Sequence, residues 1–435
     1  MFYKYLKQKF IKDSIFLYSS SYISYGLTFI TAIVLARGLG AETYGLLALL
    51  ISIIEFTKLS FTINTNEATI KFLSEYIDKE KGKALLVIKT SYLLDFILGT
   101  IISAILFFTA GLIGEKIFHD TRIEYFLKIY ALLPLCDSVQ STSNAVFQVF
   151  KKFNYFGFLM VFSKLMKLLG ILFFISAGLK NVLFVFIGVT AMSSILYMVL
   201  AIKLIHKRLS GIRIVKSFEP IKAFLYFNLH VYLSTTFKAL NSRLDILLLG
   251  YFRPLAEVGY YKIALTIVGI LTVIYEPLVV NIYPRIAELW NQKKKTEIKN
   301  LLIKSSVFIG TFAVVAATGI VLFAKPLIMA FYGKEYEPAR FAIYILIGGG
   351  VYASFVFWAR SFILGIGYPN ISAALGFFSA VFIAFACFFL IPRYGYIGAS
   401  IAVLLNFCIF NTILIIIVHN FIRKEKDEDR ISVCS

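Results

Sequence analysis

Cysteine and histidine are scarce in this chain of 435 residues, which contains four of each. The four histidines lie in different segments, with neither metal-ligand nor nucleophile spacing between them. None of the cysteines has metal-ligand spacing, and three of the four lie in apolar runs typical of buried small hydrophobic residues. These are Cys136, Cys387, Cys408 and Cys434. We therefore expect no metal site and no cofactor.

Two further absences argue against catalysis. The chain lacks a glycine-rich phosphate-binding loop, which disfavours an ATP-driven pump. It also lacks long connections between its apolar segments, and the longest loop expected outside the membrane, about residues 325–337, is very short. Membrane enzymes generally carry their acids, histidines or arginines on a sizeable loop. We therefore expect that the protein is not an enzyme.

Apolar residues are abundant. They make up 59% of the chain, and the mean hydropathy is +0.82. This composition predicts a polytopic membrane protein. The formal net charge of +20 is then better explained by basic residues gathered in the cytoplasmic loops than by a nucleic-acid partner. The first apolar run, Ser14 to Ala36, is too long for a signal-peptide core and is expected to be the first transmembrane helix.

Apolar runs of membrane-spanning length predict an all-α integral membrane protein with about twelve transmembrane helices. The first six are expected at about 14–36, 43–65, 84–113, 122–150, 155–178 and 181–205. The second six are expected at about 222–250, 259–287, 297–324, 338–364, 369–391 and 394–421.

Basic residues are distributed unevenly between the two sets of loops. With the N-terminus in the cytoplasm, about 25 lysines and arginines fall inside and about nine outside. This asymmetry predicts that both termini of the multi-pass chain are cytoplasmic, in the plasma (inner) membrane. An even number of helices is required for that topology.

A polar stripe runs along the span 222–250. At 100° per residue its members fall within roughly an 80° arc. They are His230, Ser234, Lys238, Asn241 and Asp245. A lipid-facing helix would not carry such a stripe, so two interpretations are open. The stripe lines a water-filled cavity, or Lys238 and Asp245 pair with neighbouring helices and determine their packing.

Three other spans carry polar faces at helical spacing. The second has Glu55, Lys58, Thr62 and Asn66, the fourth has Asp137, Ser141, Asn144 and Gln148, and the eighth has Lys262, Thr266, Gly269 and Glu276. Lys164 and Lys167 are neighbours on the fifth span. A charge exposed to lipid at mid-helix costs about 2.5–3.5 kcal/mol, so several of these side chains must face water or partners. Pro134 and Pro277 permit kinks in the fourth and eighth spans.

A weak internal repeat relates the two halves. LGAETYGLLAL (39–49) follows the first span, and LAEVGYYKIAL (255–265) follows the seventh. Both segments start from the same side of the membrane, which indicates a parallel repeat of six plus six helices. We expect an N-terminal bundle at 1–210 and a C-terminal bundle at 211–435.

At these positions the sequence resembles the polysaccharide flippases, the Wzx-like family of the multidrug/oligosaccharidyl-lipid/polysaccharide exporter superfamily. The superfamily also holds the MATE-type drug exporters and the peptidoglycan-precursor flippase. The resemblance is carried by the order and spacing of five segments over the whole chain. They are ARGLGAETYGLLAL (36–49), NEATIKFLSEY (66–76), RLDILLLG (243–250), VGYYKIAL (258–265) and GYIGASIA (395–402).

The resemblance implies a V-shaped, MATE-like pair of pseudo-symmetric six-helix bundles around a cationic central cavity. The implied cargo is a polyprenyl-diphosphate-linked oligosaccharide, moved by alternating access from the cytoplasmic to the outer leaflet for polysaccharide synthesis. The candidate ligands of its diphosphate and sugars are Lys58, Lys238, Lys262, Asn241, Asn66 and Asn144. The candidate carboxylates for coupling to H⁺ or Na⁺ are Glu55, Asp95, Asp137, Asp245 and Glu276. We expect a monomer in the lipid bilayer.

Two alternative functions are kept. A MATE-type multidrug exporter coupled to cations would share the fold, but members typically carry an acidic residue in the first helix, and Ser14 to Ala36 contains none. A membrane polymerase or glycosyltransferase would act on the same lipid-linked sugars, and the short loops disfavour it.

Overall fold

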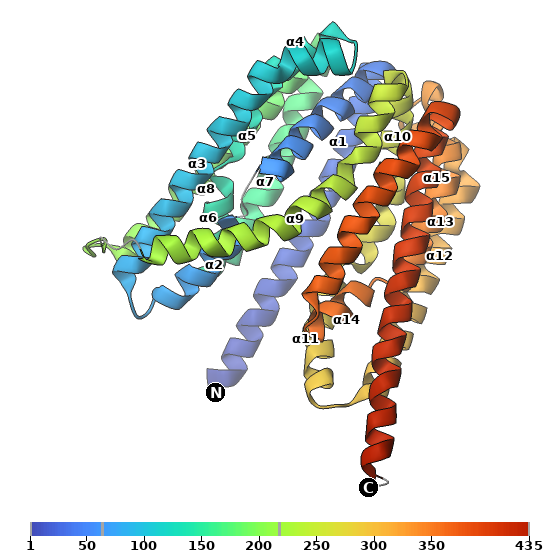
Figure 1. Cartoon of the computed structure of the whole chain (residues 1–435). Coiled ribbons are helices and arrows are strands. Elements are labelled where there is room, and N and C mark those ends of the chain that lie inside the picture. Colours follow the sequence, from blue (N-terminus) through green and yellow to red (C-terminus); the bar gives the residue numbers. More distant parts are fainter. Residues whose placement is uncertain (1, 62–64, 216–218, 434–435) are drawn as a thin grey trace. The chain divides into compact units, whose positions relative to one another are not determined.

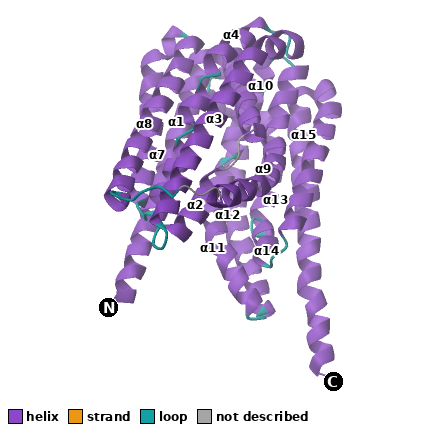
Figure 2. Cartoon of the chain, turned by 60° about the vertical axis from the view of Figure 1, so that its left-hand side comes forward, coloured by secondary structure: helices purple, strands orange, loops and turns teal. Residues whose placement is uncertain are grey.

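The structure is a computed structural model, which describes residues 2–61, 65–215 and 219–433. Within these ranges the side chains of residues 2–14, 229–241, 277, 280–281 and 424–433 are not described. Every long regular element in the described ranges is an α-helix, and no strand occurs in them (Figure 2). The prediction of an all-α fold is confirmed.

The chain forms fifteen α-helices over the described residues. The first nine are α1 (Phe2–Phe61), α2 (Thr65–Tyr76), α3 (Lys81–Gly111), α4 (Thr121–Tyr130), α5 (Leu133–Asp137), α6 (Gln140–Val149), α7 (Phe153–Phe174), α8 (Leu179–Leu209) and α9 (Glu219–Phe252). The other six are α10 (Leu255–Val268), α11 (Ile270–Asn291), α12 (Lys295–Phe331), α13 (Ala339–Phe355), α14 (Ala359–Gly365) and α15 (Pro369–Val433). Figure 1 labels them along the chain.

The chain divides into two compact units, Met1–Leu240 and Asn241–Ser435. The division falls inside α9, so the first part of this helix belongs to unit 1. There Phe224 is fully buried and packs with Ala68 and Phe72 of α2 and Val87 of α3. The predicted bundle boundary at residue 210 stays a prediction.

Eight helical segments in the described ranges are long and apolar enough to cross a membrane. Two of them, Ile15–Phe61 and Pro369–Arg423, each contain two helices that meet at a glycine. The predicted spans 122–150 and 222–250 are not among the eight: the first is divided into the short helices α4, α5 and α6. On α12, Phe308 is 65% exposed and Leu322 is 70% exposed. Large apolar side chains exposed on apolar helices fit a lipid environment, and the chain is a helical membrane protein.

Two of the helix breaks require glycine. Gly40 has φ 74° where α1 changes direction, and Gly395 has φ 58° within α15. Residues with a side chain rarely adopt positive φ, because Cβ then approaches the backbone. These glycines divide the predicted first span from the second and the eleventh from the twelfth.

The kinks expected at two prolines are realised differently. Pro134 lies in the first turn of α5, where a missing N–H costs no intrahelical hydrogen bond. It therefore starts a new helix inside the predicted fourth span. The predicted eighth span is interrupted at Gly269, between α10 and α11, whereas residue 277 lies within α11.

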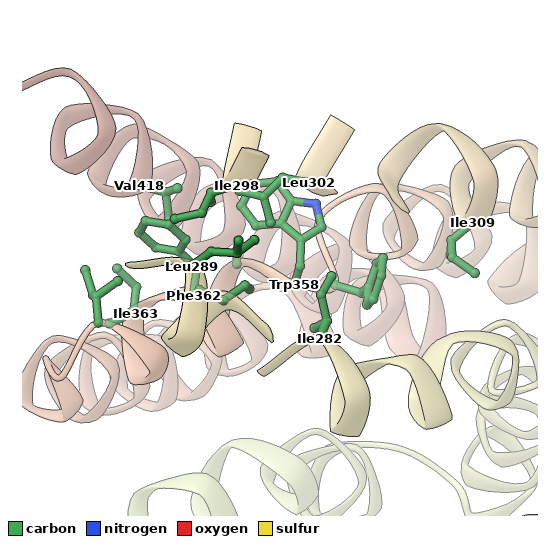
Figure 3. Packing of buried hydrophobic residues seen from close by; sticks show 13 residues of the cluster. Ile282, Leu289, Ile298, Leu302, Ile309, Trp358, Phe362, Ile363 and Val418 are labelled. Atoms are coloured by element: carbon green, nitrogen blue, oxygen red, sulfur yellow. The ribbon is translucent and has the colours of Figure 1, made fainter. Parts of the chain in front are cut away.

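Each unit has its own apolar core. In unit 1 a cluster around Phe147, Tyr197 and Leu73 joins α2, α3, α6 and α8. In unit 2, Figure 3 shows Trp358 and Phe362 packed with Leu289 and Ile298 of α11 and α12. The Trp358 indole N–H donates to the Ser306 hydroxyl at 2.6 Å. That hydroxyl donates in turn to the Phe355 carbonyl at 2.6 Å, at the break between α13 and α14.

Candidate functional site

Two predicted polar stripes meet inside unit 1. The Lys58 ammonium, near the C-terminal end of α1, forms an ion pair with Asp137 at the end of α5. Their side chains are 30% and 24% exposed. The Asn66 amide of α2 donates to the Ser141 carbonyl of α6 at 3.0 Å. The polar faces predicted on the second and fourth spans are therefore in contact. The spacing of polar residues within each span predicted the two faces but not the contact between them.

A buried carboxylate lies beside this contact. Asp95 of α3 is 5% exposed and accepts hydrogen bonds from the Thr65 hydroxyl at 2.5 Å and the Thr142 hydroxyl at 2.6 Å. The Thr142 backbone N–H adds a third bond at 3.2 Å. Three donors compensate a carboxylate for the loss of water. Asp95 thereby joins α2, α3 and α6. The sequence identified the carboxylate as a candidate but contained no stripe that indicated its partners.

Two lysines of α7 extend the cluster. Lys164 and Lys167 are half-buried. Lys164 lies within electrostatic range of Glu55, and Lys167 within range of Glu55, Lys58 and Asp137. The Lys167 ammonium also lies 4.8 Å from the centroid of the Phe186 ring. Sequence reasoning noted this pair as neighbours but did not assign it to the site, because only tertiary packing places α7 beside α1.

The polar cluster of unit 1 brings three ammonium groups together. We define the lysine cluster as Lys58, Lys164 and Lys167 with the carboxylates Glu55 and Asp137. With the buried Asp95 carboxylate beside the cluster, three ammonium groups accompany three carboxylates, and Asp95 is already compensated by its hydroxyl and N–H donors. In a partly shielded site a charge interacts more strongly than in bulk water. The arrangement is chemically suited to an anionic group.

Asn144 of α6 is the remaining predicted residue of unit 1. Its side-chain oxygen Oδ1 is buried and has no hydrogen-bond partner among the described residues. A buried amide oxygen of this kind is able to accept a hydrogen bond from a ligand hydroxyl.

The predicted residues of unit 2 lie in different surroundings. Asp245 of α9 is 6% exposed and accepts a hydrogen bond from the Tyr261 hydroxyl of α10 at 2.6 Å. The Ile246 N–H adds a second bond at 2.8 Å. Of the two interpretations of its stripe, this geometry favours pairing with a neighbouring helix at Asp245. Lys262 on α10 is half-buried, and Glu276 on α11 is exposed. The side chains of Lys238 and Asn241 lie outside the described residues.

Each of the two repeated segments contains a glutamate that forms an ion pair with an arginine. Glu42 forms an ion pair with Arg122 at 2.8 Å, and Arg122 also binds Asp120, which caps α4. The guanidinium lowers the pKa of Asp120. In the second copy, Glu257 pairs with Arg253 at 3.0 Å and accepts the Tyr396 N–H at 2.9 Å. These contacts were not predicted from the sequence.

Comparison with known families and relatives agrees with this architecture. The family model described as "Polysaccharide biosynthesis protein" matches residues 10–290. An uncharacterized membrane protein of Methanocaldococcus jannaschii, MJ1068, is 22% identical over 93% of this chain and 82% of its own length. A probable low-salt glycan biosynthesis flippase of Haloferax volcanii, Agl15, is 24% identical over 46% of this chain and 42% of its own length.

Solved structures share the fold. An inward-facing MATE-family multidrug resistance transporter superposes with a TM-score of 0.79 at 14% identity, covering 93% of this chain and 96% of that chain. The lipid II flippase MurJ in an inward closed conformation gives a TM-score of 0.67 at 15% identity, covering 93% and 87%. At these identities the similarity establishes the fold alone, and the predicted MATE-like fold is confirmed.

Proposed function

The chain belongs to the polysaccharide biosynthesis protein family, and we propose that it is a flippase for a polyprenyl-diphosphate-linked oligosaccharide. Agl15, a probable flippase of glycan biosynthesis, is a relative over nearly half of the chain. The cargo would pass from the cytoplasmic to the outer leaflet of the plasma membrane, with both chain termini in the cytoplasm. Its lipid tail would stay in the bilayer during the step.

The observation that carries the proposal is the lysine cluster of unit 1. A diphosphate is the part of the cargo with the highest charge density, and ammonium groups bind phosphate as point charges. Lys58 is the proposed central ligand because its partial exposure leaves it accessible, while Asp137 holds its position. Lys164 and Lys167 would add charge around the diphosphate. Lys238 and Lys262 remain proposed ligands of the diphosphate on the basis of the sequence alone.

Polar groups beside the cluster are proposed to receive the sugars. Asn144 offers a buried acceptor without a partner among the described residues, and Asn66 presents its amide from the neighbouring helix. Asn241 is a further proposed contact. Coupling to H⁺ or Na⁺ through Glu55, Asp95, Asp137, Asp245 or Glu276 is part of the proposal, with alternating access as the transport step.

The second candidate, a cation-coupled multidrug exporter, is supported by the fold similarity to MATE transporters. The three ammonium groups of the lysine cluster weigh against it, since they would repel a cationic drug. The absence of an acidic residue from Ser14 to Ala36 weighs against it as well.

The test is translocation in proteoliposomes. The purified chain is reconstituted with a fluorescent polyprenyl-diphosphate oligosaccharide or with a cationic dye, and a membrane-impermeant quencher reports the exposed leaflet. Movement of the glycolipid alone supports the flippase. Movement of the dye alone would replace the proposal with the exporter.

A further inference from the structure

A groove of about 390 Å³ lies within unit 2, between α11 and α12. Its floor is made by side chains of the apolar core: Ile282, Ile309 and Phe357 are each less than 10% exposed. Its rim carries Leu278, 37% exposed, and Phe308, 65% exposed. The volume falls in the range of small-molecule sites. An exposed apolar rim of this kind is suited to contact with hydrocarbon in a bilayer.

Two basic side chains line this otherwise apolar groove, Arg285 of α11 and Lys304 of α12. Arg285 binds Glu288 at 2.7 Å, an ion pair that is half exposed. The Lys304 ammonium has no ion pair or hydrogen bond among the described residues. No carboxylate lines the groove among the residues that the structure describes. An ammonium on an apolar helix is costly when it has only hydrocarbon around it, so an anionic partner would stabilise it.

Both bases lie near the turn that joins α11 to α12. Figure 1 shows this turn where α11 ends. Arg285 is six residues before Asn291, and Lys304 is nine residues after Lys295, the first residue of α12. At 1.5 Å per residue, these offsets are about 9 and 14 Å along the helices. Three consecutive lysines, Lys293 to Lys295, form the tip of the hairpin. The groove thus has its two bases at the end nearer the basic tip, and apolar side chains beyond them.

We propose that this groove binds an anionic phospholipid of the bilayer, with the phosphate at Lys304 and Arg285 and an acyl chain along Leu278, Phe308 and Ile309. The argument is charge complementarity combined with amphiphilic shape. Basic pockets between transmembrane helices select anionic headgroups by this chemistry. The site is separate from the lysine cluster of unit 1 and does not depend on the proposed cargo.

Lipid binding is measured by native mass spectrometry of the full chain in neutral detergent. The chain is titrated with phosphatidylglycerol or phosphatidylcholine of the same acyl chains. We expect phosphatidylglycerol adducts at lower lipid concentration. Each of Lys304→Gln and Arg285→Gln should weaken the tightest adduct about fivefold, the value of one base near an anionic headgroup. Lys299→Gln is the matched control, because Lys299 is exposed on the same turns of α12 and does not line the groove.

A second variant tests the groove without removing charge. Ser305→Trp fills the space between α11 and α12 and should reduce phosphatidylglycerol binding while all bases remain. Equal binding of the two lipids would overturn the proposal, as would an equal loss in Lys299→Gln and Lys304→Gln. Displacement of phosphatidylglycerol by equimolar polyprenyl phosphate would also overturn it and assign the groove to the carrier lipid.

Discussion

Lys58 and Asp137 form an ion pair across 79 positions of sequence and join α1 to α5 inside unit 1. Each lies on a polar stripe that is visible in the sequence, but their contact depends on how two helices pack. Two roles are open for Asp137. It serves only to neutralise Lys58, or it holds the lysine in position to bind a phosphate. Removing one partner leaves the other charge uncompensated.

Lys58→Ala should abolish transport of the diphosphate-linked oligosaccharide while the protein still inserts and folds. The double variant Lys58→Ala/Asp137→Ala separates ligand binding from pairing. If Lys58 binds the diphosphate, the double variant stays inactive in proteoliposomes. Recovery of transport in the double variant would mean that the lysine only neutralises Asp137. Retained transport in both Lys58→Ala and Lys238→Ala would contradict the assignment of the diphosphate site.

Lys167→Gln should raise the KM for the glycolipid between about tenfold and a hundredfold with a smaller effect on the maximal rate, since one charge-assisted contact is worth about 1.5–3 kcal/mol. The physical reason is the loss of one of three ammonium groups in the lysine cluster. Initial rates of flipping at several glycolipid concentrations provide the measurement. Lys203→Gln, at an exposed position of α8, is the control and should leave KM unchanged. The same rise in both variants would point to a general surface-charge effect instead.

Thr142→Val should destabilise unit 1 by about 1.5–3 kcal/mol, because the Asp95 carboxylate loses a hydroxyl donor in a buried position. Valine has nearly the shape of threonine, so the packing is preserved. The midpoint of thermal unfolding in detergent measures the effect. Thr266→Val is the comparison, since that hydroxyl bonds only to the Lys262 carbonyl of its own helix among the described residues. Similar midpoints for the two variants would count against a structural role of the Asp95 network.

Gly395→Ala should lower the midpoint of thermal unfolding, although alanine has a higher helix propensity than glycine. Its φ is 58°, and an added Cβ would lie 2.1 Å from the Glu257 Oε2 atom. The substitution therefore strains the backbone and displaces the glutamate from the Tyr396 N–H. Gly319→Ala, in α12 with nothing within 4 Å of its Cβ position, should be neutral or stabilising. An unchanged midpoint for Gly395→Ala would show that the break tolerates a side chain.

The class of fold could be predicted from composition and run length. Apolar runs of about twenty residues have few stable alternatives to a membrane helix, because backbone N–H and C=O groups need partners in hydrocarbon. Interruptions were harder to predict. Pro134 does start a helix inside the fourth span, but the eighth is broken at Gly269 rather than at Pro277. A proline permits a kink, whereas packing decides whether and where the chain turns.

The sequence by itself determined that this chain is a helical membrane protein, that polar stripes run along several of its helices, and that segments 39–49 and 255–265 repeat weakly. These properties depend on local hydropathy and on the helical period, which a single segment already contains. Only the tertiary structure decided that Lys58 meets Asp137, that Asp95 binds Thr65 and Thr142, and that Asp245 is paired with Tyr261. A stripe specifies which face of a helix is polar. The partner it meets is selected by the rotation and neighbours of that helix, which are set by packing over the whole unit.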